Sequence, residues 1–215
     1  GGSSSSLLNA ADGGPPLPSA SCSAISATGR FAAVGLSVPP YLLMWPIDDD
    51  DILPGKKLQS IQKNLPGHTD DVASMSFSHR GDCLLTGAQD GTARAWMWRG
   101  KLNSVQHIKL AASPEQIQTA HAPAMSQHFP ANKPYSIWID MVAWSCDDRY
   151  VFTSESLRKQ TKEKQCVSSC VRVWALPPAA FHTRPNNNGE FVHELDDCQP
   201  TLLNTLQASD VLLPL

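Results

Sequence analysis

The stretch LPGHTDDVASMSFSHRGDCLLTGAQDGTARAWMWR, residues 65–99, decides the fold of this chain. Apolar and polar residues alternate in VASMSF, and a second apolar run, DCLLTGA, follows the Ser-x-x-Gly turn at residues 78–81. Alternation of this kind predicts half-buried strands. Asp90-Gly91 then precedes TARAW, and Asp-Gly between two apolar runs predicts a tight hairpin, because Gly tolerates the positive φ of such turns. The stretch therefore predicts three successive strands.

This stretch resembles one blade of a WD-repeat β-propeller, with Gly67-His68 before the first strand and Trp96 at the end of the third. In WD repeats four side chains commonly form a buried hydrogen-bonded set. The resemblance assigns these roles to His68, Thr86, Asp90 and Trp96. The indole would donate to the hydroxyl, the hydroxyl to the imidazole, and the imidazole to the carboxylate. Breaking the set at His68 is expected to cost roughly 1–3 kcal/mol of folding free energy.

A hydroxyl, an imidazole and a carboxylate also make up a hydrolase triad. Here no nucleophile-elbow or oxyanion-hole motif accompanies them. Gly-rich phosphate loops and metal-ligand spacings are absent from the sequence as well. We therefore expect a chain that is not an enzyme and that needs no cofactor and no metal.

The blade recurs in two weaker copies. SATGRFAAVG, SHRGDCLLTG and SCDDRYVFTS align without gaps, each after an alternating strand and before a strand that ends in Trp. These Trp residues are Trp45, Trp96 and Trp174. Candidate outer strands follow at 57–62, 105–110 and 201–206. We expect an all-β fold, a WD40 propeller with about three four-stranded blades of an incomplete ring, because closed rings typically have four to eight blades.

These patterns divide the chain into segments. They are a flexible low-complexity segment at 1–18, a diverged blade at 19–64, a complete blade at 65–110, a long loop at 111–134, a blade at 135–206 and the start of a further blade at 207–215. The blade at 135–206 carries insertions at 155–166 and 177–200, which are expected to be surface loops. Since three blades cannot close a ring, we expect the parent protein to supply more.

Composition limits the classes of partner. The net charge of −3 indicates no general binding to nucleic acid. No apolar run is long enough to predict a membrane span, and no signal peptide is visible. The six cysteines form no CxxC pair, and Cys166 and Cys170 come closest to a site, so a reduced intracellular chain is expected.

One small basic cluster stands out within the insertion at 155–166. It consists of Arg158, Lys159, Lys162 and Lys164. The cluster would contact phosphate or an acidic partner, or it would simply be a solvated loop.

The chain resembles the bromodomain and WD-repeat family over roughly residues 21–213. The resemblance rests on HTDDVASMSFSHRGDCLLTGAQDGTARAW, on the long connection after it, and on DMVAWSCDDRYVFTS followed by VRVW. Departures are Met97 in place of Asp, and Gln207-Ala208 where the family has Gly-His. The resemblance implies a propeller of about eight blades followed by two bromodomains, a nuclear location, and roles in chromatin, transcription, cytoskeletal organisation and cell shape.

Two function classes follow from this reading, and a WD-repeat scaffold of another family is a further alternative. The first is a protein-interaction scaffold, whose partners are other proteins. The second is a substrate receptor of a cullin-based ubiquitin ligase, since such receptors often carry Trp-Asp-x-Arg at the end of the third strand of a blade. Here the sequence is Trp96-Met97-Trp98-Arg99, so Arg99 would pair with adaptor carboxylates or be a solvated arginine at a strand end.

Overall fold

The computed structural model describes residues 19–37, 40–47, 67–99, 101–129, 134–177 and 199–207. Several predicted segments lie outside these residues: the low-complexity segment 1–18, the outer strand 57–62, most of the insertion at 177–200 and most of the segment 207–215. In the described residues no helix is both long and apolar enough to cross a membrane.

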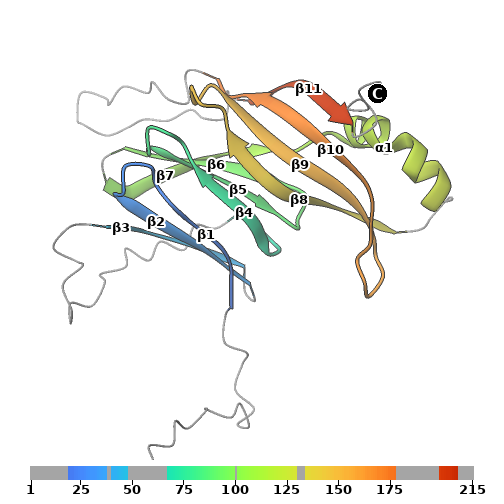
Figure 1. Cartoon of the computed structure of the whole chain (residues 1–215), viewed down its shortest axis with the longest axis horizontal. Coiled ribbons are helices and arrows are strands. Elements are labelled where there is room, and N and C mark those ends of the chain that lie inside the picture. The colour runs from blue at the N-terminus through green and yellow to red at the C-terminus, as the bar shows by residue number, and fades with distance from the viewer. Residues whose placement is uncertain are drawn as a thin grey trace, which may run out of the picture.

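The described strands form three antiparallel sheets (Figure 1). The first contains β1 (Ser19–Ile25), β2 (Phe31–Ser37) and β3 (Tyr41–Pro46). The second contains β4 (Val72–Phe77), β5 (Cys83–Ala88), β6 (Ala93–Arg99) and β7 (Lys101–Leu110). The third contains β8 (Tyr135–Trp144), β9 (Tyr150–Lys159), β10 (Cys166–Ala175) and β11 (Thr201–Gln207). Within each sheet every strand pairs with its neighbour in sequence.

The turn between the first two strands of each sheet is stabilised by a serine at an equivalent position. The hydroxyls of Ser26, Ser78 and Ser145 accept the backbone N–H groups of Phe31, Cys83 and Tyr150 at 3.0, 3.1 and 3.0 Å. This bond holds the two strands in register, which explains why the three Ser-initiated segments align without gaps. The repeat predicted from the sequence is therefore a repeat of structure.

The third copy of this turn also ties one sheet to the next. Asp148 has a φ of 56°, in the left-handed region, where the second copy has Gly81. Its carboxylate accepts the backbone N–H groups of His79 and Arg80 at 2.8 and 2.9 Å. The strain of an aspartate at positive φ is small, and these two bonds bridge the turns of the second and third sheets.

Two apolar cores lie between the sheets. Leu85, Ala95 and Ile108 of the second sheet pack with Ile139 and Trp144 of the third, and all of them are buried. The other face of the second sheet packs against the first sheet. There the Trp98 ring makes edge contacts with Phe31 and Phe77, at centroid distances of 5.2 and 5.9 Å. The second sheet is thus covered on both faces.

The sheets stack in chain order, and their first strands β1, β4 and β8 lie next to one another (Figure 1). The Trp144 indole on β8 donates to the backbone oxygen of Ser76 on β4 at 3.0 Å. Stacked sheets whose first strands meet are the arrangement of consecutive propeller blades. The predicted all-β propeller fold is confirmed, and we call the sheets the first, second and third blades.

The structure overturns one prediction between the second and third blades. The segment 111–134, predicted to be a long loop, contains the helix α1 (Pro114–His128). Ser113 and Gln116 form a capping box, in which each side chain accepts the other residue's backbone N–H, and Pro114 occupies the first turn. The sequence Ser-Pro-Glu-Gln is typical of a capping box. The helix is nearly without an apolar face, so its apolar residues do not show the helical repeat that would predict it.

The insertion at 155–166 is also different from the predicted loop. β9 continues to Lys159 and β10 begins at Cys166, so half of the insertion lengthens a β-hairpin and residues 160–165 form its end. Leu157 is fully buried within this extension. Extra ladder pairs with β8, from Tyr135 to Ile139, make the longer hairpin part of the sheet.

Candidate protein-interaction site

The second blade brings together the four residues predicted to form its hydrogen-bonded set. The Trp96 indole donates to the Thr86 hydroxyl at 2.8 Å. The Thr86 hydroxyl lies 2.8 Å from His68 Nε2, and His68 Nδ1 lies 3.0 Å from Asp90 Oδ2. Because the indole can only donate and the ionised carboxylate can only accept, the chain of donors runs from Trp96 to Asp90. The set joins the segment before β4, strand β5, strand β6 and the turn between them.

Asp90 is held as an anion at the end of this set. Burial is the largest single influence on its pKa and acts to raise it, but the hydrogen bond and charge of His68, together with bonds from Thr92 and Thr69, outweigh burial and lower the pKa to about 2. Thr92 contributes its backbone N–H and its hydroxyl to Asp90 Oδ1, at 2.9 and 2.7 Å. Oδ1 therefore stabilises the β5–β6 turn, and Oδ2, which bonds His68 and Thr69, ties that turn to the segment before β4.

This geometry does not suit a hydrolase triad. The Thr86 side chain is completely buried, and its hydroxyl lies between Trp96 and His68. A nucleophile must reach a substrate atom, and here the strands of the blade enclose the hydroxyl. The set acts as a lock for the blade.

The third blade repeats half of this lock. Thr153 and Trp174 hold the positions of Thr86 and Trp96, and the Trp174 indole donates to the Thr153 hydroxyl at 3.0 Å. Among the described residues no histidine extends this pair, as expected from the missing Gly-His before β8. The blade instead carries a second polar set that the sequence analysis did not find.

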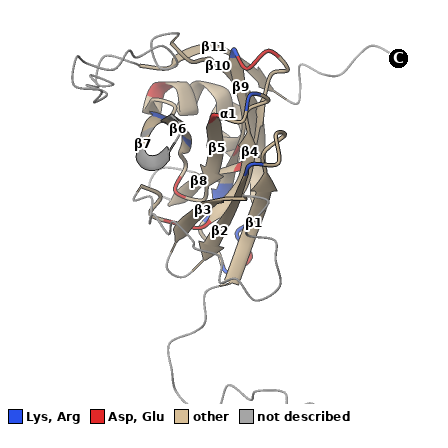
Figure 2. Cartoon of the chain, turned by 90° about the vertical axis from the view of Figure 1, so that its left-hand side faces the viewer, with Lys and Arg blue, Asp and Glu red and all other residues tan. Residues whose placement is uncertain are grey.

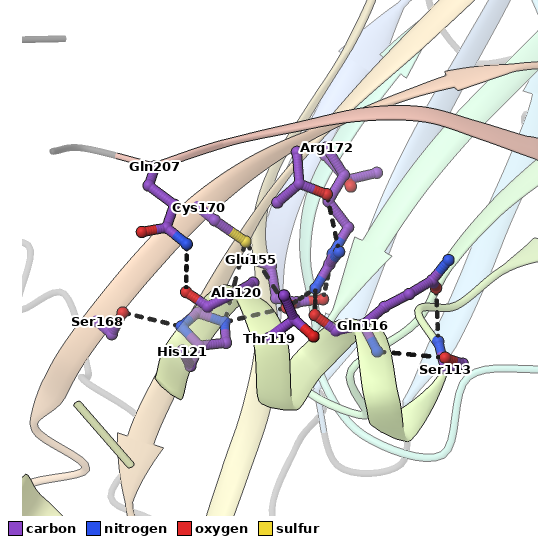
Figure 3. Close-up of polar contacts among 12 residues, drawn as sticks. Ser113, Gln116, Thr119, Ala120, His121, Glu155, Ser168, Cys170, Arg172 and Gln207 are labelled. Carbon is purple, nitrogen blue, oxygen red and sulfur yellow. Dashed lines mark hydrogen bonds and ion pairs between the residues drawn. The ribbon is translucent and has the colours of Figure 1, made fainter. Parts of the chain in front are cut away.

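This second set, the α1 cluster, consists of His121, Glu155, Ser168, Cys170 and Arg172 (Figure 3). The Arg172 guanidinium donates to both carboxylate oxygens of Glu155, at 3.0 and 2.7 Å. His121, which reaches in from α1, lies 3.0 Å from Glu155 and 2.8 Å from the Ser168 hydroxyl. Glu155 and Arg172 are each 1% exposed and His121 is 0% exposed. The cluster therefore fixes the helix to the sheet from inside.

The pKa of Glu155 reflects its neighbours in the cluster. Burial is the largest influence and would raise the pKa, but hydrogen bonds from His121 and Arg172 and the charge of Arg172 bring it below its ordinary value. Glu155 is therefore the anion that balances the buried guanidinium. A buried charge is tolerated only when it is paired in this way.

One sequence signal pointed to this cluster. Arg172 in CVRVW is aligned with Arg94 in TARAW, two residues before the tryptophan in each blade. In the second blade Arg94 reaches back to the carbonyl of Gly67 at 2.6 Å. The aligned Arg172 of the third blade therefore also needs an acceptor for its guanidinium. The sequence does not indicate that this acceptor is Glu155.

The helix and the sheet border an open groove of about 550 Å³. Its walls are the second half of α1, including Ala120 and Ala124, and residues 166–169 of β10, with Gln207 at one end. Additional bonds hold both walls: Gln207 donates to the carbonyl of Ala120 at 2.9 Å, and Arg172 donates to that of Gln116 at 3.3 Å. Rigid walls around an accessible groove suit recognition of another molecule.

The predicted basic cluster lies at the far end of the β9–β10 hairpin. Arg158 pairs with Asp140 at 2.9 Å, and its guanidinium lies 4.4 Å from the centre of the Trp138 ring. The Lys164 ammonium lies over the same ring at 4.8 Å. Lys159 is half-buried and Lys162 is exposed. The structure brings Arg158 and Lys164 together on Trp138, and Figure 2 shows the basic and acidic residues as short separate segments of the ribbon.

The remaining candidate residues are less informative. Arg99 ends β6, but its side chain lies outside the described residues. Met97 and Trp98 beside it are 8% and 4% exposed, so they belong to the cores between the blades. Cys166 is exposed and Cys170 is buried, so these two cysteines are not a pair.

Comparison with known families agrees with the blade geometry. The WD40 family, described as "WD domain, G-beta repeat", matches residues 59–97, which include the complete second blade lock. Residues 59–97 are thus a WD repeat in sequence as well as in structure. The WD-repeat chain is also similar to the solved structures of U3-55K and of the RRP9 WD40 repeats, each at 13% identity, a TM-score of 0.42 and 75% coverage of this chain. It spans 47% and 46% of those two chains, just under half of each.

WD40 repeats are generally non-catalytic scaffolds that bind other proteins. In this chain the second blade lock and the α1 cluster are both largely buried and serve packing. The chain's additions to the repeat, namely α1 and the lengthened β9–β10 hairpin, border the groove. They form what we call the α1 groove.

Proposed function

We propose that this WD-repeat chain is the part of a bromodomain and WD-repeat scaffold that binds a partner protein at the α1 groove. The observation that carries the proposal is the rigid attachment of α1. A helix nearly without an apolar face gains little from burial of its own surface. Here a bond between His121 and Glu155 and a bond from Arg172 to the Gln116 carbonyl hold it. The buried polar contacts of the α1 cluster therefore fix the position of this one surface helix.

The groove has the features of a recognition surface. One wall is lined by small residues, among them Ala120 and Ala124, and the other by Ser168 and Ser169. A rigid scaffold loses little conformational entropy when it binds. Loops and helices added to a repeat are also where such scaffolds acquire specificity.

The experiment compares two variants in which an alanine of α1 is replaced by arginine. Ala124→Arg places a large side chain in the groove, whereas Ala122→Arg changes an exposed alanine that does not line it. Each full-length protein is cross-linked in cells and its partners are identified by mass spectrometry. We expect Ala124→Arg to lose a specific set of partners that Ala122→Arg retains. Identical partner sets for the two variants would contradict the groove as the binding surface.

We further propose that the parent protein is nuclear and associated with chromatin, with roles in transcription and in cytoskeletal organisation and cell shape. The support is the resemblance of the second blade, of the segment after it and of DMVAW to the bromodomain and WD-repeat family. The parent reading frame tests this directly, because two bromodomains should follow the propeller. Their absence would return the chain to the wider class of WD-repeat scaffolds.

A further inference from the structure

Three donor atoms of different chemistry meet inside the α1 cluster (Figure 3). His121 Nε2 lies 3.0 Å from Glu155 Oε1, and Cys170 Sγ lies 3.9 Å from the first atom and 3.7 Å from the second. All three side chains are buried. They come from α1, β9 and β10, so spacing along the chain could not reveal them, and the sequence analysis expected no metal.

The triangle of donors has nearly the dimensions of one face of a zinc tetrahedron. Zinc binds imidazole nitrogen, carboxylate oxygen and thiolate sulfur at about 2.0–2.3 Å, which puts neighbouring donors roughly 3.3–3.6 Å apart. The three observed separations differ from this range by a few tenths of an ångström. Small side-chain shifts would bring the three atoms around one ion.

The groups behind the donors include partners typical of a metal site and one competing cation. Metal-bound histidine usually donates its second ring N–H to an acceptor, and here His121 Nδ1 faces the Ser168 hydroxyl at 2.8 Å. Arg172 Nε holds Glu155 Oε2 at 3.0 Å, which orients the carboxylate. Arg172 also donates to Oε1 at 2.7 Å, so the guanidinium competes with a metal for that oxygen and would weaken its binding.

We propose that His121, Glu155 and Cys170 form a binding site for one Zn²⁺ ion, which fastens α1 to the third blade. In the metal-free cluster Glu155 accepts from His121 and Arg172. Cys170 is then a thiol that donates to Glu155 Oε1 at 3.7 Å. When zinc binds, the sulfur–metal bond replaces the S–H bond and one proton leaves to solvent. The His121 proton moves from Nε2 to Nδ1 and is donated to Ser168, so the net release is one proton per zinc.

The test uses the full chain without an affinity tag, stripped with a chelator and titrated with Co²⁺ in place of Zn²⁺. We expect one equivalent of cobalt and an absorption band from charge transfer between thiolate and metal. Cys170→Ser should abolish the band. Cys166→Ser, which removes the exposed cysteine on the same strand, should leave it intact. No cobalt binding by the folded chain, or a band that survives Cys170→Ser, would overturn the proposal.

Two measurements on the unaltered chain keep the test independent of how the variants fold. X-ray absorption of the zinc-loaded chain should show one sulfur neighbour per zinc, and a first shell without sulfur would contradict the site. Calorimetry in buffers with different ionisation enthalpies should report one proton released per zinc, and zero release would mean that Cys170 remains a thiol. Neither result depends on the partner-binding experiment, so the two proposals fail separately.

Discussion

The second and third blades share a buried Trp–Thr hydrogen bond and complete it in different ways. In the second blade the bond continues through His68 to Asp90, so the lock closes within one blade. In the third blade no described residue extends the Trp174–Thr153 bond, and the α1 cluster supplies a second set of buried polar contacts. The comparison teaches that a WD blade can lose half of its own lock when another buried polar set connects its strands to an added element.

The largest effect is expected from the ion pair in the third blade. Arg172→Met leaves Glu155 buried without its cation, and the free energy of unfolding should fall by about 3–5 kcal/mol. Chemical denaturation of the full chain measures this. Arg149→Met, at an exposed arginine on the same blade, is the control and should change stability by less than about 0.5 kcal/mol.

A double variant sharpens that result. Glu155→Leu/Arg172→Met replaces both charges with apolar side chains, so neither partner is left unpaired. The double variant should be less destabilised than the sum of its two single variants. If the losses simply add, the two charges do not act as a pair.

The two threonines test the difference between the locks directly. Thr86 bonds both Trp96 and His68, whereas Thr153 bonds only Trp174 among the described residues. Thr86→Val should therefore cost about 2–3 kcal/mol, since it leaves two buried groups unpaired, and Thr153→Val about 1 kcal/mol. Thermal and chemical unfolding of the two variants measures the gap. Equal losses would mean that the histidine adds nothing to the lock of the second blade.

Acid should weaken the second blade through Asp90. Its pKa falls from an ordinary 3.8 to about 2 in the folded chain. The stabilisation is therefore complete above about pH 4 and is lost as the pH falls toward 2, an effect of about 2 kcal/mol. Asp90→Asn should flatten this part of the stability profile, and Asp70→Asn, at an exposed residue before β4, should not. If Asp90→Asn leaves the dependence of stability on pH unchanged, Asp90 does not cause the loss of stability in acid.

The smallest effect is expected at the end of β6. Met97 replaces the aspartate of the adaptor-docking motif, and Met97 and Trp98 are buried between blades. Arg99→Glu should therefore leave recovery of a cullin-ligase adaptor unchanged in a pull-down of full-length protein. A clear loss of adaptor would instead favour the substrate-receptor function.

Local patterns predicted most of the strands. The serine turns, the Asp-Gly hairpin and the alternating apolar residues act over a few neighbouring positions, so each could be read without knowledge of the rest of the chain. The extension of β9 could not be read in this way. Its charged and polar residues are typical of a loop, and they join the sheet because β8 and β10 offer pairing partners and Leu157 packs inside.

The sequence by itself determined the order of blades and the four members of the second blade lock, because the Gly-His, Asp-Gly and Trp positions of a WD repeat lie within one short stretch. Only the tertiary structure decided that α1 exists as a docked helix and that His121 and Arg172 both bond Glu155. These residues are distant in sequence and belong to three different elements. Their contacts depend on how the helix crosses the sheet, and that placement arises from burial and pairing of charges rather than from any local pattern.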